Sequence, residues 1–393
     1  MDASSDAGGT DGGAPSDGHT GDALSPVDDA GVDAGAPDAG PARTLRLLDA
    51  HLANTCAIRG GQLFCWGDNF VGQLADGTTT DGARPVEITL PSAAVNVAVG
   101  QSFVCALVES GDVYCWGNNM SGQLGQGDHM ARTSPTRIAG LVDVLSLDAG
   151  NTHACARTPD GVSCWGGNAA GQLGTALGGA EDRPTPVSAT GIAGTISLVT
   201  GVGHTCVLLV GGIGKCWGLN TWGQLGNGGL MDSRVAQDVS TLIGAIALDS
   251  EGAHTCAVLS TGDVSCWGWN MYGQLGFAGA DATTPRALTG FRGRAMRVEA
   301  GATFTCVLST VDGLQCLGDN MYGELGDGST TSRTTLAAVA GLPGTVVDVA
   351  GGAGHACARF EDDSIKCWGL NTHGQLGDGT MTDSSLPVDV LFP

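Results

Sequence analysis

The sequence predicts an all-β fold, a seven-bladed β-propeller with four short strands in each blade. Two observations carry this prediction. A motif that begins Cys-Trp-Gly, or Cys-Leu-Gly in one copy, returns at steps of about fifty residues, a period typical of circular or solenoid arrays. Each unit also divides into four short apolar segments separated by glycine-rich turns, which is the pattern of stacked strands. The seven copies begin at Cys65, Cys115, Cys164, Cys216, Cys266, Cys316 and Cys367.

The second unit illustrates the expected strands. Apolar residues run continuously or alternate in residues 95–99, 103–108, 113–116 and 135–138. A short turn follows the first segment, a hairpin turn follows the second, and a long loop follows the third. The chain contains 66 Gly in 393 residues, and they fall at fixed offsets, so they indicate turns rather than a flexible polymer.

The two ends of the repeat region predict how the ring closes. Residues 44–49 form an extra apolar segment before the first cysteine, and the chain ends just after a strand expected at residues 387–391. We therefore expect the N-terminal strand to pair within the last blade and close the ring. A linear solenoid would instead need atypical capping repeats at both ends.

Residues 1–43 differ in composition from the repeats. They consist almost wholly of Ala, Gly, Asp, Ser, Pro and Thr, with nine Asp and one Arg, Arg43. Such a segment cannot bury enough apolar surface to offset its ordering entropy, so we predict a disordered acidic spacer. It is either a tether or a tail without a role, and residues 44–393 form the propeller.

Net charge limits the classes of partner. The chain carries 40 Asp and Glu against 17 Lys and Arg, for a formal net charge of −23 at pH 7. A nucleic acid or an anionic membrane would approach against an unfavourable field. We expect no nucleic-acid partner, and membrane contact only through an N-terminal anchor removed from this chain.

All fourteen cysteines fall into seven pairs that flank a hairpin turn. The two side chains of a pair would lie opposite one another on adjacent antiparallel strands, where a disulfide fits. The alternatives are small buried hydrophobic residues of a cytosolic protein, or zinc ligands, for which each unit offers only two thiols. The predicted disulfides are Cys56 with Cys65, Cys105 with Cys115, Cys155 with Cys164, Cys206 with Cys216, Cys256 with Cys266, Cys306 with Cys316, and Cys357 with Cys367.

Seven disulfides imply an oxidising compartment, so we expect an extracytoplasmic protein at the cell surface, in the periplasm or secreted. No apolar segment has the length of a signal peptide or a membrane span, and Met1 leads directly into the spacer. We therefore expect that a targeting segment has been removed and that Met1 is an added or misplaced start residue.

Three motifs resemble those of the regulator of chromosome condensation repeat family. They are the segment around His254 to Val258, the Cys-Trp-Gly-x-Asn-x-x-Gly-Gln-Leu-Gly run from Cys266 to Gly276, and Gly-Asp-Gly-Thr at Gly377 to Thr380. The resemblance covers the chain outside the spacer and implies a seven-bladed propeller. The family includes a nucleotide exchange factor for a small nuclear GTPase, a plant ultraviolet-B photoreceptor and a secreted bacterial inhibitor of β-lactamases. The chain is closest in character to the secreted bacterial members, but paired cysteines in every blade depart from all three, so no single function transfers.

Repeated polar residues favour structural roles over catalysis. A histidine precedes the second strand in four units, and a catalytic histidine would be needed only once. We expect these four to make a hydrogen bond within each blade, the Asn after each Trp-Gly to cap a turn, and the repeated Trp to pack between blades. The histidines are His153, His204, His254 and His355, and the tryptophans are Trp66, Trp116, Trp165, Trp217, Trp267 and Trp368, with Leu317 in the sixth unit.

We expect no enzyme, no cofactor and no metal. The chain has no phosphate-binding glycine loop, no nucleophile elbow and no zinc-binding helix motif. The Gly-Asp-Gly-Thr segment at 377–380 and its relatives lack the ligand spacing of a calcium loop. A hydrolase or lyase at the central channel would need an asymmetric cluster of polar groups in one or two blades, and comparison of the units predicts none.

The dipeptide between the repeated Asn and the following Gly varies from unit to unit, although the fifth and sixth units share Met-Tyr. If the long loops share one face, as propeller symmetry requires, these residues form a ring there, and exposed aromatic and methionine side chains are typical of binding hot spots. The alternative is that they pack beneath their own loops. The predicted binding residues are Phe70, Met120, Trp222, Met271, Tyr272, Met321, Tyr322 and His373.

Together these observations predict an exported, disulfide-stabilised, monomeric propeller that serves as a platform for a protein partner on one loop face. One alternative is a guanine-nucleotide exchange factor for a small GTPase, which requires reduced cysteines. The others are binding of a surface glycan and inhibition of a secreted enzyme.

Overall fold

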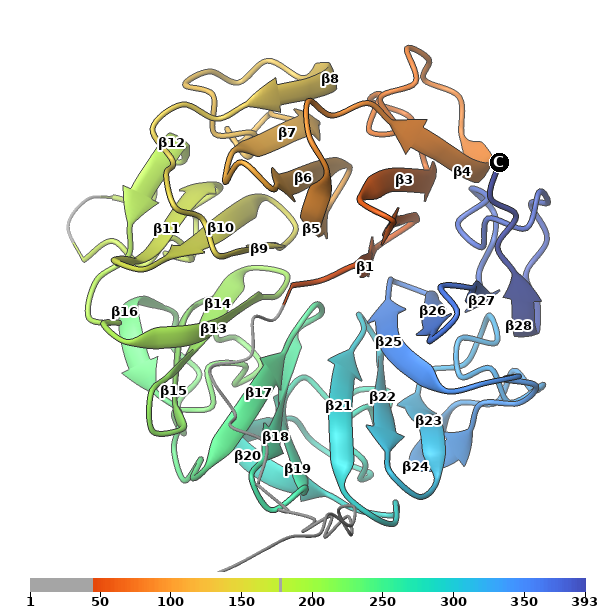
Figure 1. Ribbon diagram of the computed structural model, residues 1–393. Coiled ribbons are helices and arrows are strands. Elements are labelled where there is room, and N and C mark those ends of the chain that lie inside the picture. Colours follow the sequence, from red (N-terminus) through yellow and green to blue (C-terminus); the bar gives the residue numbers. More distant parts are fainter. Residues whose placement is uncertain (1–44, 177–178) are drawn as a thin grey trace, which may run out of the picture. The chain divides into compact units, whose positions relative to one another are not determined.

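The computed structural model describes residues 45–176 and 179–393, and the spacer predicted for residues 1–43 lies outside these ranges. Within them, seven four-stranded antiparallel sheets are arranged in a ring (Figure 1), and there is no helix. The predicted all-β, seven-bladed propeller is confirmed. The described residues accordingly hold no helix long and apolar enough to cross a membrane.

Each blade uses four consecutive strands, ordered from the centre of the ring outwards. Blades one and two contain β1 (Leu48–His51), β2 (Asn54–Arg59), β3 (Gln62–Gly67), β4 (Gly82–Ile88), β5 (Ala94–Gly100), β6 (Phe103–Val108), β7 (Val113–Gly117) and β8 (Arg132–Arg137). Blades three and four contain β9 (Ser146–Ala149), β10 (His153–Thr158), β11 (Gly161–Gly166), β12 (Arg183–Ser188), β13 (Thr195–Thr200), β14 (His204–Leu209), β15 (Ile213–Gly218) and β16 (Ser233–Asp238). Blades five to seven contain β17 (Ala245–Asp249), β18 (His254–Leu259), β19 (Val264–Gly268), β20 (Ala282–Leu288), β21 (Ala295–Ala300), β22 (Phe304–Ser309), β23 (Gly313–Gly318), β24 (Arg333–Ala338), β25 (Val346–Gly351), β26 (His355–Phe360), β27 (Ile365–Gly369) and β28 (Ser384–Asp389).

The fourth strand is where the sequence pattern was least accurate. In the second unit the first three predicted strands match β5, β6 and β7 to within one residue at each end, whereas β8 starts three residues before the predicted segment. The outer strand faces solvent along most of its length, and its residues are largely polar. An apolar pattern therefore detects only its end.

The predicted closure of the ring is wrong. β1 pairs with β2 in the first blade, with Leu48 opposite Ala57 and Asp49 opposite Cys56, and β28 pairs with β27 in the last blade. Only two residues, Leu52 and Ala53, connect β1 to β2, so the hairpin closes locally at little entropic cost. Every unit already supplies four strands, and the seam between blades seven and one is closed by side chains and packing.

Tryptophan packing between blades is confirmed. Each repeated Trp is fully buried and donates its indole N–H to the carbonyl oxygen of a residue in the preceding blade, at 2.8–2.9 Å. Trp66 closes the seam in this way by donating to Gln375. A close approach also explains the glycine after Gln-Leu: Gly226 has φ near +67°, and a Cβ there would lie 2.7 Å from the indole nitrogen of Trp267.

The structure contains all seven predicted disulfides. Each joins the second and third strands of one blade at a Cα–Cα distance of 4.0–4.2 Å, and the cysteines are buried. Such a bridge limits the unfolded chain only across one short hairpin. The disulfides therefore stabilise individual blades and leave the contacts between blades to other groups.

Candidate functional site

The antiparallel meander places alternate connections at opposite edges of every blade. The first-to-second and third-to-fourth connections share one edge, such as residues 52–53 and 68–81 in the first blade. We call the surface formed by these two sets of connections the loop face. All seven variable dipeptides belong to third-to-fourth connections, so they lie on the loop face at equivalent positions.

The first residue of each dipeptide is exposed, and the second residue is half-buried in most units. Phe70 and Met120 are 81% and 82% exposed, and Met271 is 73% exposed. Trp222, Tyr272 and His373 are half-buried, whereas Met321 and Tyr322 are exposed. The predicted residues therefore share a face, while their role in binding stays a prediction.

A repeated hydrogen-bond pattern holds each loop rigid. The buried Asn after Trp-Gly accepts, on its Oδ1, the backbone N–H of the Leu five residues later in all seven blades. Its amide donates to carbonyls across the loop, as Asn69 does to Thr80. This agrees with the predicted turn-capping role. Because the loops are fixed before a partner arrives, their side chains lose little conformational entropy on binding.

Aromatic rings from two neighbouring loops contact one another. The ring centroids of Trp222 and Trp269 are 6.2 Å apart, and those of Trp269 and Tyr272 are 5.5 Å apart in an edge-to-face arrangement. Trp269 was missed from the sequence, although the residue between Trp-Gly and Asn is a second variable position. We define the aromatic patch as the following residues of blades four to six: Trp222, Trp269, Met271, Tyr272, Met321 and Tyr322.

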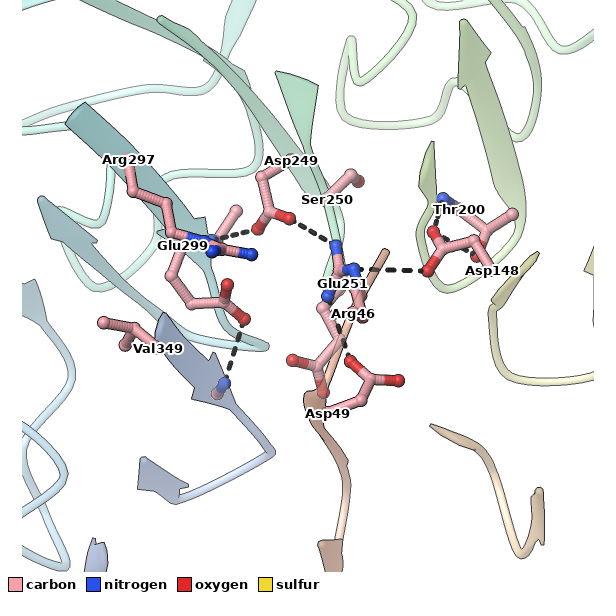
Figure 2. Close-up of polar contacts among 12 residues, drawn as sticks. Arg46, Asp49, Asp148, Thr200, Asp249, Ser250, Glu251, Arg297, Glu299 and Val349 are labelled. Atoms are coloured by element: carbon pink, nitrogen blue, oxygen red, sulfur yellow. Dashed lines mark hydrogen bonds and ion pairs between the residues drawn. The ribbon is translucent and has the colours of Figure 1, made fainter. Parts of the chain in front are cut away.

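A second group of polar side chains lies at the centre of the ring, around Arg46 (Figure 2). The guanidinium of Arg46 pairs with Asp49 at 3.0 Å, with Asp148 at 3.6 Å, and closely with Asp249. These carboxylates come from the inner strands of blades one, three and five. A single cation therefore binds three blades together.

Each of these acids also binds the inner strand of the next blade. Asp49 accepts the backbone N–H of Val99 at 2.7 Å, and Asp148 accepts that of Thr200 at 2.6 Å. Glu299 of blade six likewise accepts the N–H of Gly351 at 2.9 Å. These bonds satisfy backbone donors that no strand ladder reaches.

Burial shifts the titration of the central acids. It raises the pKa of Asp148 to about 7 despite the opposing effect of Arg46, and it raises the pKa of Glu251 and Glu299 well above the ordinary value. For Arg46, burial acts to lower the pKa, but Asp148, Asp249 and Asp49 together raise it above its ordinary value. The cluster therefore keeps Arg46 charged while part of its carboxyl groups hold protons at neutral pH.

A histidine and a glutamate lie side by side where this cluster reaches the loop face. His51 Nε2 lies 2.8 Å from Asn151 Oδ1 and donates to it, which leaves Nδ1 as an acceptor 3.3 Å from Glu251 Oε1. Burial lowers the pKa of His51 and raises that of Glu251. Burial thus favours the neutral form of both side chains, and neither His51 Nδ1 nor Glu251 Oε1 has a hydrogen-bond partner among the described residues.

The expectation that no asymmetric polar cluster occupies the channel is wrong. The residue opposite the first cysteine of a blade is acidic in blades one, three, five and six and apolar in the others. A comparison of the units that is centred on the repeated motif does not include this position, because it lies before the repeated run of residues. The acids pair with Arg46 or with backbone N–H groups, which indicates a structural role.

The repeated histidines bind across blades, so the predicted bond within each blade is wrong. The Nε2 of His153 lies 3.0 Å from the hydroxyl of Thr205 in the next blade, which donates in turn to the carbonyl of Gln172. The same contact joins His204 to Thr255, His254 to Thr305 and His355 to Thr55, the last across the seam. Burial lowers the pKa of the first three histidines to about 3 and that of His355 to about 4.

Three side chains at the seam bring ligand-type atoms together. Asp68, Asp81 and His373 place one such atom each within 4.8 Å of the others, as no other group of three does in the described ranges. His373 Nδ1 lies 2.8 Å from Asp81 Oδ2, and Asp81 Oδ1 accepts the N–H of Asn69. Asp68 accepts from Gln73. Hydrogen bonds thus account for the positions of all three side chains, and His373 joins blade seven to blade one.

Comparison with known sequences decides the family. Residues 60–107, 110–157 and 261–308 match the regulator of chromosome condensation (RCC1) repeat, and a second form of that repeat matches residues 94–123 and 346–375. The chain carries RCC1 repeats. The expected repeats are confirmed, and the matches fall in blades one to three and five to seven.

Solved structures agree with an RCC1-type propeller. Human WBSCR16 is 22% identical with a TM-score of 0.76, over 84% of this chain and 94% of that one. Prp20p of Saccharomyces cerevisiae is 21% identical with a TM-score of 0.76, over 89% and 88%. The ectodomain of the Arabidopsis thaliana receptor kinase ACR4 is 19% identical with a TM-score of 0.54, over 88% and 99%. At these identities the similarity establishes the fold.

Proposed function

We propose that this RCC1-repeat propeller is an extracytoplasmic, disulfide-stabilised platform that binds a protein partner through its loop face. The aromatic patch carries the proposal. Met271 and Met321, 73% and 60% exposed, lie on the same set of rigid loops as the half-buried, contacting rings of Trp222, Trp269 and Tyr272. Exposed aromatic and methionine side chains gathered on one surface are typical of protein-binding sites and are not needed for the blade core.

The patch is tested by site-specific photo-crosslinking. A photoreactive residue is placed at Met271 in the patch, or at Val210, which is 68% exposed on the opposite edge. We expect a discrete cross-linked protein from the surface or secreted fraction only at Met271. Equal products at both positions, or at Val210 alone, would argue against the patch.

Replacing Trp222, Tyr272 and Tyr322 together by Ala should remove that cross-link and leave the thermal midpoint nearly unchanged. All three side chains lie on loops outside the buried core of the blades. Trp165, which is fully buried between blades, provides the contrast, since its replacement by Ala should cost about 3–5 kcal/mol. A large loss of stability in the triple variant would identify the three residues as core.

The location outside the cytoplasm is supported by the seven disulfides, because such bonds persist in oxidising compartments. The test is to denature the protein from its natural source, alkylate it without reductant and measure its mass. We expect no labelled thiol. Labelling of every cysteine would refute the assignment.

The alternative is a nucleotide exchange factor, which is favoured by the structural similarity to Prp20p, a protein whose binding to Gsp1p and histones has been examined. Release of a fluorescent guanine nucleotide from small GTPases measures this activity. Under the proposed function, adding the propeller leaves the release rate unchanged. Acceleration that the triple Ala variant loses would establish the alternative.

A further inference from the structure

The connections of the loop face carry acidic side chains and neither Lys nor Arg. Each of the seven third-to-fourth connections contains at least one Asp, and none contains Lys or Arg. The first-to-second connections also lack Lys and Arg, and their one acidic residue, Glu251, is buried. The connections concerned are residues 68–81, 118–131, 167–182, 219–232, 269–281, 319–332 and 370–383.

Local bonds hold several of these charges in position. Asp232 Oδ1 accepts the backbone N–H of Asn220 at 2.8 Å, and Asp281 Oδ1 accepts that of Asn270 at 2.8 Å. Asp383 bonds Asn371 in the same way at 2.7 Å. These three Asp residues are exposed. The bond that fixes each one uses a single oxygen, so the charge of the carboxylate is displayed on a rigid loop.

The aromatic patch lies among these acids. Asp232 and Asp281 belong to the same two loops as Trp222, Trp269 and Tyr272. Faces of Trp and Tyr rings attract ammonium and guanidinium groups, and carboxylates around them strengthen that attraction. An anionic partner would meet carboxylates in every loop, although Asp128, Glu181 and Asp327 pair with Arg132, Arg183 and Arg333 at the start of the adjoining outer strands.

On the basis of the proposed function, we propose that the occupant of the aromatic patch is a polypeptide segment rich in Lys and Arg that also carries an apolar anchor residue. The anchor residue of the partner packs against Met271 and the aromatic rings, and this contact buries apolar surface of both proteins. The cationic side chains lie over the ring faces and along the Asp residues of the adjoining loops. Charge complementarity thus selects the partner, and the apolar contact supplies much of the affinity.

The test uses labelled synthetic peptides of equal length with the same Leu anchors and with Lys, Gln or Glu at all other positions. Binding is measured by fluorescence anisotropy at low and high salt. The key variant combines Asp81→Asn, Asp232→Asn, Asp281→Asn and Asp383→Asn. Asparagine keeps the Oδ1 acceptor that each backbone N–H needs, so these four backbone bonds are retained while four charges are removed. At position 81 the ion pair with His373 is lost together with the charge.

A matched control removes four charges from the opposite edge. It combines Glu109→Gln, Asp143→Asn, Asp160→Asn and Glu361→Gln, all of which are exposed in hairpin turns or outer connections. Net charge is the same in both variants. Any difference between them therefore reports the position of the charge and not the total.

We expect the Lys peptide to bind, the Gln peptide to bind more weakly, and the Glu peptide not to bind. The loop-face variant should weaken Lys-peptide binding about tenfold, which equals about 1.4 kcal/mol, and lose most of the salt dependence. The control variant should bind like the wild type. Equal binding of Lys and Gln peptides, or an unaffected loop-face variant, would overturn the proposal.

Two results, one from cross-linking and one from peptide binding, distinguish failure of this proposal from failure of the proposed function. If the triple Ala variant at Trp222, Tyr272 and Tyr322 loses the Met271 cross-link while the loop-face variant keeps it, the platform stands and the cationic partner is refuted. If the Lys peptide binds the triple Ala variant as tightly as the wild type, the aromatic patch is not its site and this proposal is overturned.

Discussion

Replacing Arg46 by Met should destabilise the propeller far more than a typical surface substitution. Methionine matches the length of the aliphatic stem but removes the charge that Asp49, Asp148 and Asp249 share. The side chain of Arg46 is only 15% exposed, so water cannot take its place. Removing one partner of a buried ion pair typically costs about 3–5 kcal/mol, and we expect a loss in this range at pH 8.

The loss of stability should be smaller in acid, because the carboxylates left without Arg46 can then take up protons. Protonating a carboxyl group whose unperturbed pKa is near 4 costs about 1.4 kcal/mol at pH 5 and about 5 kcal/mol at pH 8. Protonation therefore relieves the unpaired charges cheaply at pH 5. We expect the penalty of Arg46→Met to fall to about 1–2 kcal/mol there.

Urea denaturation followed by tryptophan fluorescence at both pH values measures these differences. Arg137→Met is the matched control, because Arg137 pairs with Asp112 at the surface and its side chain is half exposed. Its midpoint should match the wild type at both pH values. A loss below about 1 kcal/mol for Arg46→Met at pH 8, or a larger loss at pH 5 than at pH 8, would refute the reasoning.

Three further predictions concern the acid, the histidine and the disulfide pattern. Burial raises the pKa of Asp148 to about 7, so the folded state binds an extra proton between about pH 4 and 7 and loses stability as pH rises through this range. Asp148→Asn should therefore flatten the dependence of the unfolding free energy on pH between pH 5 and 8, measured by urea titration. Burial lowers the pKa of His254 to about 3, so the stabilising effect of this neutral histidine is lost as pH falls from 6.5. The double variant His254→Phe, Thr305→Ala should therefore denature at a lower pH than the wild type. An unchanged midpoint of acid denaturation would contradict this. Replacing Cys256 and Cys266 by Ala should cost at most about 3 kcal/mol, measured by calorimetry, because the closed loop is short.

The histidine swap copies interfaces that the chain already contains. Where Phe103 or Phe304 replaces the histidine, the next blade offers Ala154 or Ala356 in place of threonine. Both pairs lie within buried apolar clusters. A polar pair and an apolar pair are therefore interchangeable at this position. A single substitution would leave either a buried hydroxyl or a buried ring nitrogen without its partner.

The fold was predictable because repetition multiplies a weak signal. One Cys-Trp-Gly segment says little, but seven copies at one period fix the number of blades and the hairpin that each disulfide joins. The same reasoning failed wherever blades differ or meet. Asp49 and Asp148 stand before the repeated run, and the partner of His153 is in another unit, so no pattern within one unit reveals either contact.

Trp269 and Arg46 show two further limits. Trp269 occupies a position filled by Asp, Asn, Gly or Leu in other units, and its importance emerges only when the ring places it beside Trp222. Arg46 stands outside the repeats, just before β1, and nothing in its neighbours indicates that it reaches carboxylates about one hundred and two hundred residues away. Both depend on contacts that only closure of the ring creates.

The central cluster explains how the ring stays closed without an exchanged strand. All disulfides act within blades. The seam between blades seven and one has the contacts found at other junctions, such as Trp66 with Gln375 and Thr55 with His355. It also has the pair His373 with Asp81 and the packing of Phe392 against Phe64 and Trp66. All of these seam contacts join neighbouring blades only. Arg46 enters from the first blade and binds acids of the third and fifth, which resists separation of blades that are not neighbours. Closure is therefore reinforced from the centre of the ring, and loss of the Arg46 side chain should weaken it.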